Sequence, residues 1–378
     1  MERLTRELKT LEEKNRYRTL KLGEGVDFCS NDYLAISSHP RIYDVLKSAI
    51  ARGVPIGSGG SRLLRGNHEE HELLESKAAE FFGFPNSIYF ASGFDANYAI
   101  FSTLPSRKDA VILDEKIHAS VKEGVRASFA EKITARHNDL QSFEDALGLA
   151  RARGAKDLFI AVEALYSMDG DLAPLPELLA LAEKFNAHLI VDEAHSVGVF
   201  GKFGRGLSED LPKSDKLITV YPCGKAIGVS GALVCCSNEI RDYLVNQSRI
   251  FQYSTAPSPL IALAVSRSLE VINEEPWRRE ALLEKVEFAI EQFRAELRYF
   301  RLLNQQSQIL PIVIGSSQQA SEVGTQLRSR GWDVREIRPP TVPEHSARLR
   351  VSIRVTHQES EISGLAKALG EVERQYEN

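Results

Sequence analysis

The sequence has few cysteines, no long apolar run and no large excess of charge of either sign. Its 378 residues include four cysteines, at positions 29, 223, 235 and 236, and the formal charge is -5. The cysteine spacing is not that of a metal site, and two cysteines are adjacent, so we expect reduced thiols and no bound metal. The longest apolar runs have about seven residues, against roughly 18 for a membrane span. Without a basic block, nothing favours binding to nucleic acid or an anionic membrane.

The N-terminal segment MERLTRELKTLEEKNRYR has the pattern of an amphipathic helix. Leu4, Leu8 and Leu11 fall on one helical face, and acidic and basic residues are mixed along the segment. A secretory signal would have an apolar centre, and an organelle transit peptide would avoid glutamate. We therefore expect an N-terminal arm on a cytoplasmic protein.

Short apolar runs alternate with helical patterns through the first two thirds of the chain. Six such runs are typical of buried strands, and they lie at residues 87–93, 110–116, 158–167, 188–196, 217–225 and 231–237. This alternation predicts a doubly wound α/β fold with a mostly parallel sheet. After Pro257 come two long helical segments, three short strands and a last amphipathic helix, which indicate a smaller α+β domain. We thus predict an arm at 1–35, a large domain at 36–265 and a small domain at 266–378.

Polar residues follow several of these strands, where ligands bind in parallel sheets. The run HLIVDEAHS ends in Asp192, Glu193 and His195, which could hold a cationic heterocycle or could simply form a turn with a helix cap. Lys225 lies among small residues in CGKAIGVSGA, where loss of solvent would make it a nucleophilic amine.

Two glycine-containing segments could bind anions. In ASGFDANYA a strand runs into a helix that starts after Ser92 and Gly93, and backbone N–H groups there can bind phosphate, although ordinary helix capping gives the same pattern. GSGGSRLLRGN, at residues 57–67, is either a second anion-binding loop or a flexible turn.

Together these groups suit one cofactor. An amine that forms an imine, a carboxylate for a pyridine nitrogen, a histidine beside a phenolic oxygen and a helix start for phosphate are what pyridoxal 5′-phosphate requires. The chain resembles the α-oxoamine synthase family of fold-type I, pyridoxal-phosphate-dependent transferases, from about Phe28 to His357. The segments that carry this resemblance are CSNDYLA, GSGGSRLLRGNHEEHELLE, SGFDAN, DEKIHAS, EALYSMDGDLAPL, DEAHSVGVFGKFGRG, GKAIGVSGA, QYSTAPSP and IRPPTVPEHSARLRVSI.

The resemblance implies a role for each matching residue. Lys225 is similar to the Schiff-base lysine, Asp192 to the partner of the pyridine nitrogen, His195 to the residue bonded to the phenolic oxygen, and His118 to the imidazole stacked on the ring. The other implied cofactor contacts are Ser92, Gly93, Phe94, Glu163, Ser167, Ser254 and Thr255, of which Ser254 and Thr255 would reach the phosphate in the neighbouring subunit of a homodimer. Arg18, Asn31 and Arg350 would contact the substrates, and Arg350 would bind the amino acid carboxylate.

One position departs from the family pattern. Three residues before the lysine, the family usually has a hydroxyl residue that contacts the phosphate, whereas this chain has Pro222. A proline has neither a hydroxyl nor an N–H group. We expect the contact to be lost or to be made by Tyr221, Ser254 or Thr255.

The resemblance also implies a reaction, in which an amino acid condenses with an acyl thioester and loses CO2 to give an α-amino ketone. The segment IRPPTVPEHSARLR is most similar to the form found where L-alanine is joined to a pimeloyl thioester, carried on CoA or acyl carrier protein, in biotin biosynthesis. Other members join glycine to acetyl-CoA or succinyl-CoA, or serine to palmitoyl-CoA, and these remain alternatives. A non-catalytic synthase subunit is a further alternative, but it would be expected to lack the lysine that is present here.

Overall fold

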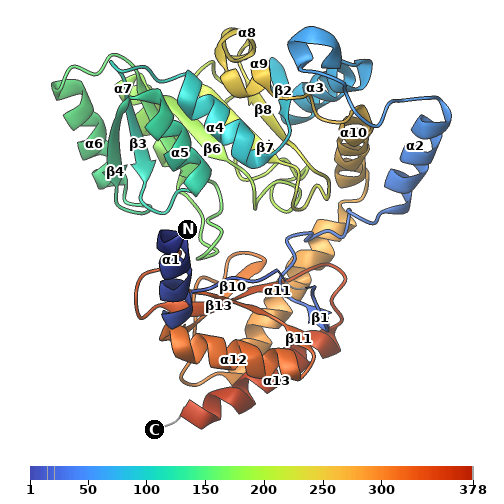
Figure 1. Ribbon diagram of the computed structural model, residues 1–378, viewed down its shortest axis with the longest axis vertical. Helices are drawn as coiled ribbons and strands as arrows, with labels where there is room; N and C mark the ends of the chain where they lie inside the picture. Colours follow the sequence, from blue (N-terminus) through green and yellow to red (C-terminus); the bar gives the residue numbers. More distant parts are fainter. Residues whose placement is uncertain (15, 21, 377–378) are drawn as a thin grey trace. The chain divides into compact units, whose positions relative to one another are not determined.

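The computed structural model describes residues 1–14, 16–20 and 22–376, and their contacts divide the chain into two compact units (Figure 1). The larger unit comprises residues 34–166 and 172–279, and the smaller unit comprises residues 1–33, 167–171 and 280–378. This division differs from the three domains predicted from the sequence. Residues 266–279 group with the larger unit because helix α10 (Pro259–Glu274) packs on α2 (Pro40–Ala51) and α3 (Glu69–Phe82). The N-terminal residues group with the C-terminal ones because strand β1 (Val26–Asp27) pairs with β11 (Trp332–Asp333).

A seven-stranded sheet forms the centre of the larger unit, in the order β2-β8-β7-β6-β5-β3-β4. Its strands are β2 (Asn86–Phe90), β3 (Ala110–Asp114), β4 (Glu131–Ala135), β5 (Leu158–Glu163), β6 (His188–Asp192), β7 (Leu217–Pro222) and β8 (Ala232–Cys236). The other helical segments of this unit are η1 (Arg62–Gly66), α4 (Gly93–Thr103), α5 (Ala119–Ser128), α6 (Leu140–Ala152), α7 (Leu175–Phe185), α8 (Asn238–Gln247) and α9 (Arg249–Tyr253).

All strands of this sheet run in one direction except β8, which is antiparallel to both β2 and β7. The predicted, mostly parallel sheet is therefore confirmed. Six strands consequently end at the same edge, where the last residues of β5 and β6 are in register. Glu163 pairs with Asp192 across β5 and β6, and Asp192 pairs with Val220 across β6 and β7. The strand order thus brings the side chains that follow these strands together at one edge of the sheet.

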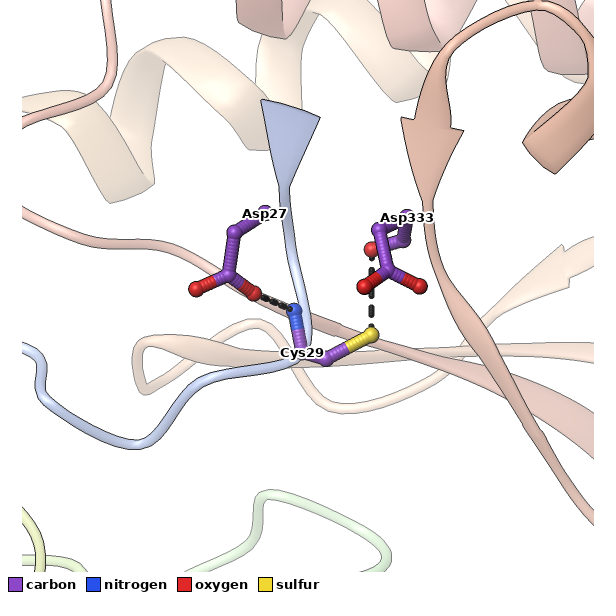
Figure 2. Close-up of side chains that lie close together, drawn as sticks. All are labelled: Asp27, Cys29 and Asp333. Atoms are coloured by element: carbon purple, nitrogen blue, oxygen red, sulfur yellow. Dashed lines mark hydrogen bonds between the residues drawn. The ribbon is translucent and has the colours of Figure 1, made fainter. Parts of the chain in front are cut away.

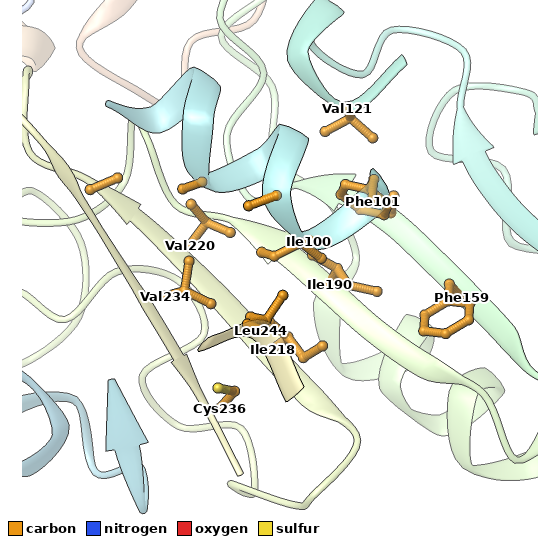
Figure 3. Close-up of a cluster of buried hydrophobic side chains, with 14 of the residues drawn as sticks. Ile100, Phe101, Val121, Phe159, Ile190, Ile218, Val220, Val234, Cys236 and Leu244 are labelled. Atoms are coloured by element: carbon orange, nitrogen blue, oxygen red, sulfur yellow. The ribbon is translucent and has the colours of Figure 1, made fainter. Parts of the chain in front are cut away.

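Helix α4 packs against this sheet through its apolar face (Figure 3). Ile100 and Phe101 of α4 lie in one buried cluster with Val121 of α5 and with Ile190 and Val220 of the strands. Apart from β4, the strands are buried on both faces, which explains their continuous apolar sequences. This packing fixes the start of α4, which begins three residues after the last residue of β2, relative to the edge where the strands end.

The smaller unit is built on a four-stranded sheet in the order β12-β13-β10-β9. Its strands are β9 (Arg301–Leu302), β10 (Ile309–Gly315), β12 (Arg335–Ile337) and β13 (Ala347–Ser352), and their pairings are antiparallel. Its helical segments are α1 (Glu2–Glu13), most of α11 (Trp277–Glu296), α12 (Ser317–Ser329), α13 (Glu359–Glu373) and η2 (Arg374–Tyr376). The α+β character predicted for the C-terminal part is present. Among the described helices, none has the length and the apolar composition needed to cross a membrane.

Candidate active site

Most of the residues predicted to contact the cofactor lie along one edge of the larger unit's sheet. Asp192 and Glu163 are the last residues of β6 and β5, and both are buried. Pro222 is the last residue of β7, Lys225 follows three residues later, and Ser92 lies two residues after β2. The sheet topology therefore places these residues at one edge, as expected for the carboxyl ends of parallel strands.

Asp192 is held from two sides. Its side chain accepts a hydrogen bond at Oδ1 from the backbone N–H of Ala194 (2.9 Å) and at Oδ2 from Nδ2 of Asn97 (2.7 Å). The residue is only 5% exposed. Each oxygen thus has one protein donor and keeps further acceptor capacity, because an ionised carboxylate accepts about four hydrogen bonds. Asp192 can therefore bind a protonated ring nitrogen without losing its fixed position.

Lys225 lies on a tight loop between β7 and β8. Its carbonyl accepts from the N–H of Gly228 (2.8 Å), and the loop is closed by a bond from the N–H of Val229 to the carbonyl of Cys223 (2.9 Å). Gly228 has a φ of +76°, and a Cβ there would lie 2.5 Å from the backbone nitrogen of Ser37. The loop therefore requires glycine at 228, and it leaves Lys225 half-buried.

His118 caps the start of α5, and the charges of Asp192 and Lys225 both affect the pKa of its ring. Its Nδ1 lies 2.8 Å from Oγ of Ser120. Burial lowers the pKa of His118 below its ordinary value, the charge of Asp192 opposes this shift, and the positive charges of Lys225 and Lys122 add to it. His118, Asp192 and Lys225 are thus close enough to interact electrostatically.

His195 is buried in the turn that follows β6, and this turn is fixed by the neighbouring acid. Glu193 is fully buried and accepts from the N–H groups of Leu207 (3.0 Å) and Ser208 (2.6 Å) and from the hydroxyl of Ser196. Burial raises the pKa of Glu193, and these donors oppose that shift. Glu193 therefore joins the turn containing His195 to the loop before β7.

The start of α4 lies directly against the proline that departs from the family pattern. Oγ of Ser92 accepts from the N–H of Asp95 (3.1 Å) and caps the helix. A Cβ on Gly93 would come within 2.9 Å of Cβ and Cγ of Pro222. The first N–H groups of an α-helix have no acceptor within the helix, so those of Gly93 and Phe94 suit a phosphate. Pro222 thus packs beneath this helix start but adds no donor to it.

Ser254 and Thr255 are exposed and follow α9. The turn after them is held by residues of the glycine-rich loop and of α3. Oγ of Ser58 donates to the carbonyl of Pro257 (2.6 Å), Nε2 of His71 lies 2.8 Å from the same oxygen, and the N–H of Ala256 donates to Gly60 (2.9 Å). Residues of the segment at 57–67 thus support residues 254–257 through hydrogen bonds.

The predicted substrate residues and Ser167 all belong to the smaller unit. Arg350, on β13, donates from Nε to the carbonyl of Ser167 (2.6 Å) and from Nη1 to Oγ of Ser352 (2.9 Å). Its Nη2 donates to Oδ1 of Asn31 (3.1 Å) and to the hydroxyl of Tyr33 (3.3 Å). The structure therefore brings Arg350 and Asn31 together. Because protein groups use four of the five guanidinium N–H groups, a bidentate carboxylate would have to replace some of these acceptors.

Arg18 is not part of this cluster and instead lines a separate pocket of about 790 Å³ in the smaller unit. Arg16, the alternative to Arg18 in the sequence, lines the same pocket and is paired with Glu344 (2.8 Å). The same pocket is also lined by Arg338 and Thr341 from the segment IRPPTVP. The arginine-containing arm and this segment thus form one cavity.

One group of side chains in the smaller unit has the spacing of metal ligands, namely Asp27, Cys29 and Asp333 (Figure 2). Both acids are paired with arginines, Asp27 with Arg354 (2.9 Å) and Asp333 with Arg335 (3.0 Å). Burial, with the charge of Asp333, raises the pKa of Cys29 to about 12. Ion pairing and a protonated thiol explain this group, so we assign no metal to it.

Two polar residues at the site were not predicted from the sequence. Asn97 bonds Asp192, and Ser120 lies between Asn97 (3.2 Å) and His118. Both are buried and both lie in segments that carry the family resemblance, SGFDAN and DEKIHAS. A buried asparagine in the second turn of an otherwise apolar helix is the signal that could have identified the first of them.

Comparison with known proteins places this fold and site in a class. Residues 23–369 match the family model described as aminotransferase class I and II. The chain is 39% identical to 8-amino-7-oxononanoate synthase of Nitrosomonas eutropha, over 90% of this chain and 88% of that protein, and 41% identical to the same enzyme of Chromobacterium violaceum, over 90% and 87%.

Solved structures agree. Serine palmitoyltransferase of S. paucimobilis, with a bound adduct of pyridoxal phosphate and myriocin, superposes with a TM-score of 0.89 at 26% identity, covering 98% of this chain and 97% of that one. The crystal structure of 8-amino-7-oxononanoate synthase from Francisella tularensis superposes with a TM-score of 0.79 at 31% identity, covering 93% and 99%. The fold and site are those of a fold-type I transferase. The chain belongs to the aminotransferase class I and II family and, within it, to the α-oxoamine synthases.

The residues at the sheet edge fit pyridoxal 5′-phosphate, the cofactor of this family. A buried carboxylate with spare acceptor capacity suits the ring nitrogen, a lysine on a fixed loop suits the aldehyde, and a helix start with free N–H groups suits the phosphate. A Cβ placed on Gly224, next to Lys225, would meet nothing within 4 Å. There is thus open space beside the lysine.

Proposed function

We propose that the protein is an 8-amino-7-oxononanoate synthase, which joins L-alanine to a pimeloyl thioester and releases CO2 and a free thiol in biotin biosynthesis. The observation that carries this proposal is the near full-length identity of 37–41% to enzymes of that name, together with retention of Lys225, Asp192 and both site histidines. Serine palmitoyltransferase superposes as well, but it shares only 26% identity with the chain.

Bound pyridoxal phosphate withdraws electrons from the α-carbon of an attached amino acid and so acidifies its proton. In this proposal the Nζ amine of Lys225 would hold the cofactor and would act as the general base that takes the α-proton. Asp192 keeps the proton on the ring nitrogen, and His195 hydrogen-bonds the phenolic oxygen. Ser92, Gly93 and Phe94 receive the phosphate, and Glu163 and Ser167 line the cofactor site.

On the substrate side, we propose that Arg350 binds the carboxylate of L-alanine, with Asn31 beside it. Its guanidinium is already aligned by Ser167 and Ser352, so little side-chain freedom is lost on binding. The pocket lined by Arg16, Arg18 and Arg338 suits an anionic part of the acyl substrate.

The decisive experiment is an assay of the purified, cofactor-loaded protein. L-Alanine, glycine and L-serine are each paired with pimeloyl, acetyl, succinyl and palmitoyl thioesters, and release of free thiol is measured. We expect the highest kcat/KM with L-alanine and pimeloyl thioester, and running pimeloyl-CoA beside pimeloyl-acyl carrier protein identifies the carrier. A higher kcat/KM for another pair would replace the proposed substrates and leave the reaction type intact.

We also propose that two copies form a homodimer in which Ser254 and Thr255 contact the phosphate in the neighbouring subunit. The support is an exposed apolar surface next to them, since α9 contacts η1 and the side chains of Tyr253 (77% exposed) and Leu64 (84% exposed) lie on or beside these elements. Large exposed apolar side chains gathered in one region are typical of an interaction surface.

The dimer is tested by Leu64→Glu and by sedimentation of the wild type and the variant. We expect a dimer for the wild type, a shift toward monomer for the variant, and a roughly tenfold or larger loss of cofactor affinity, because an introduced charge must be desolvated at the interface. Leu149→Glu, an exposed leucine on α6, is the matched control and should leave both unchanged. A monomeric wild type with full cofactor affinity would contradict the proposal.

We further propose that the protein acts in the cytoplasm, since its four cysteines are free and three of them are buried. Reduced cysteines are usual in that compartment. Localisation of the tagged full-length chain by fractionation tests this.

A further inference from the structure

A continuous hydrogen-bond path connects Asp192 with His118. Nδ2 of Asn97 lies 2.7 Å from Oδ2 of Asp192 and 3.2 Å from Oγ of Ser120, and that hydroxyl lies 2.8 Å from Nδ1 of His118. Asp192, Asn97 and Ser120 are buried, so water does not compete for the contacts among these three, whereas His118 itself is exposed. The path therefore joins the carboxylate at the end of β6 to the histidine at the start of α5.

The carboxylate sets the orientation of the amide. An ionised carboxylate only accepts hydrogen bonds, so Asn97 must turn its NH2 group toward Asp192. The opposite orientation would place two oxygens 2.7 Å apart, at the distance recorded for Nδ2 and Oδ2. With the amide in this orientation, the second N–H of Asn97 points to Oγ of Ser120. Oδ1 of Asn97 has no hydrogen-bond partner among the described residues, so it does not oppose this arrangement.

The hydroxyl of Ser120 can then donate its own proton to His118. Because Oγ accepts from Asn97, its O–H is free to donate to Nδ1 of His118. The same Nδ1 also receives the backbone N–H of Ser120 (3.2 Å). A nitrogen that accepts two hydrogen bonds cannot carry a proton without losing both of them. The proton of the neutral ring must then be on Nε2.

We propose that Asn97 and Ser120 are positioning residues through which Asp192 fixes the tautomer of His118, so that Nδ1 is bare and the proton of the neutral ring is on Nε2. In this state the ring presents an N–H donor that can polarise the carbonyl oxygen of the acyl thioester. The use of this donor on a thioester rests on the proposed function, whereas the tautomer does not.

The charged surroundings of His118 are consistent with a neutral ring. Burial is the main cause of its lowered pKa, Asp192 raises the pKa, and Lys225 and Lys122 lower it. The path through Asn97 and Ser120 acts in the same direction as burial, because it stabilises the form with an unprotonated Nδ1.

The first test is the ¹⁵N NMR spectrum of the full-length protein labelled at histidine, recorded before and after addition of pyridoxal phosphate. The His118 signals are assigned with His118→Gln. We expect a hydrogen-bearing Nε2 and a bare Nδ1 at neutral pH in both samples. A proton on Nδ1, or a doubly protonated ring at pH 7, would overturn the proposal without any variant having to fold.

The second test compares Ser120→Ala with Ser120→Thr and Ser128→Ala. Ser128 is the matched control, since it is also buried on α5 and its hydroxyl donates one hydrogen bond, to the carbonyl of Val125 (2.8 Å). We expect the pKa of His118 to rise in Ser120→Ala and in Asn97→Ala, and to stay at the wild-type value in Ser120→Thr and Ser128→Ala. An unchanged pKa in Ser120→Ala, or an equal rise in Ser128→Ala, would overturn the proposal.

Kinetics separate this inference from the proposed function. With the best substrate pair, Ser120→Ala should lower kcat about five- to tenfold, as expected for one lost hydrogen bond, with the KM for L-alanine unchanged. If the wild type shows no synthase activity while NMR finds the proton on Nε2, only the proposed function fails. If activity is present and the proton is on Nδ1, only this inference fails.

Discussion

The predicted cofactor residues and the predicted substrate residues are held in place by different means. In the larger unit, Asp192 and Lys225 follow strands of a single sheet, and strand order brings them to one edge. In the smaller unit, Arg350 is aligned by hydrogen bonds to Asn31 and Ser167, which come from distant parts of the chain. The positions of the cofactor residues thus depend on the backbone of the sheet, and the position of Arg350 depends on contacts between side chains and distant segments. Single substitutions should therefore separate cofactor binding from substrate binding.

The largest effect is expected from Lys225→Ala. Loss of the amine removes both the covalent hold on pyridoxal phosphate and the general base, so we expect the visible absorbance of the bound cofactor to disappear and kcat to fall by about 10²–10⁴-fold or more. Lys47→Ala, an exposed lysine on α2, is the control and should match the wild type in both measurements. A visible cofactor band that survives in Lys225→Ala would contradict the role given to this lysine.

A smaller and more selective effect is expected from Arg350→Lys. An ammonium group cannot replace the planar donors that reach Ser167, Ser352 and Asn31, so we expect the KM for L-alanine to rise about 10–100-fold. The dissociation constant of pyridoxal phosphate, measured by titrating the cofactor-free protein, should not change. Loss of cofactor affinity in this variant would show that the two regions are not separable.

Arg335→Lys is the matched control for this prediction. Arg335 pairs with Arg350 in register across β12 and β13 and is partly exposed beside Asp333. It should retain the wild-type KM for L-alanine. An equal rise in both variants would mean that the effect comes from the strand pair and not from binding of the carboxylate.

The difference between placement by strand order and placement by side-chain contacts also explains which features could be predicted from the sequence. Strands that are buried on both faces are continuous apolar runs, so six of the seven strands of the large sheet were predicted. The seventh, β4, has the sequence EKITA and alternates between half-buried and exposed residues at the edge of the sheet, with only its last residue buried, so it lacked that signal. Lys225 and Asp192 could be predicted as site residues because they follow predicted strands.

Contacts between distant segments could not be predicted in this way. Residues 167–171 belong to the smaller unit because Arg348 is paired with Asp169 and Arg350 donates to Ser167. The run LFIAVEALYS, which continues through Ser167, gives no sign of this change of unit. Asn97 lies in the motif SGFDAN, but a single sequence does not show that its partner is Asp192. Side-chain partners far apart in the chain require the folded structure.

The smallest expected effect is on the loss of folding stability in acid. This loss can be compared directly between the two units. In the larger unit, burial lowers the pKa of His71, His118 and His188 below 6.5, and in the smaller unit it lowers the pKa of His357. Between the folded and unfolded pKa values the unfolded chain binds more protons, so stability rises with pH there. Acidification from pH 7.5 to 5.5 should therefore destabilise both units, and the larger one more.

Hydrogen exchange, corrected for the intrinsic effect of pH, can measure this in each unit, with His188→Gln and His357→Gln as a matched pair. His188 stacks on Phe159, with ring centroids 5.1 Å apart, and its Nδ1 has no partner among the described residues, so no hydrogen bond stabilises a proton on that nitrogen. His188→Gln should flatten the pH dependence of protection in β5 and β6 and reduce the acid-induced loss of melting temperature by roughly 2 °C. His357→Gln should act only in the smaller unit, because His357 is bonded to Asp27 and Arg354 there. If each variant changed protection equally in both units, their stabilities would be coupled, and the separation between cofactor region and substrate region would hold for binding but not for folding.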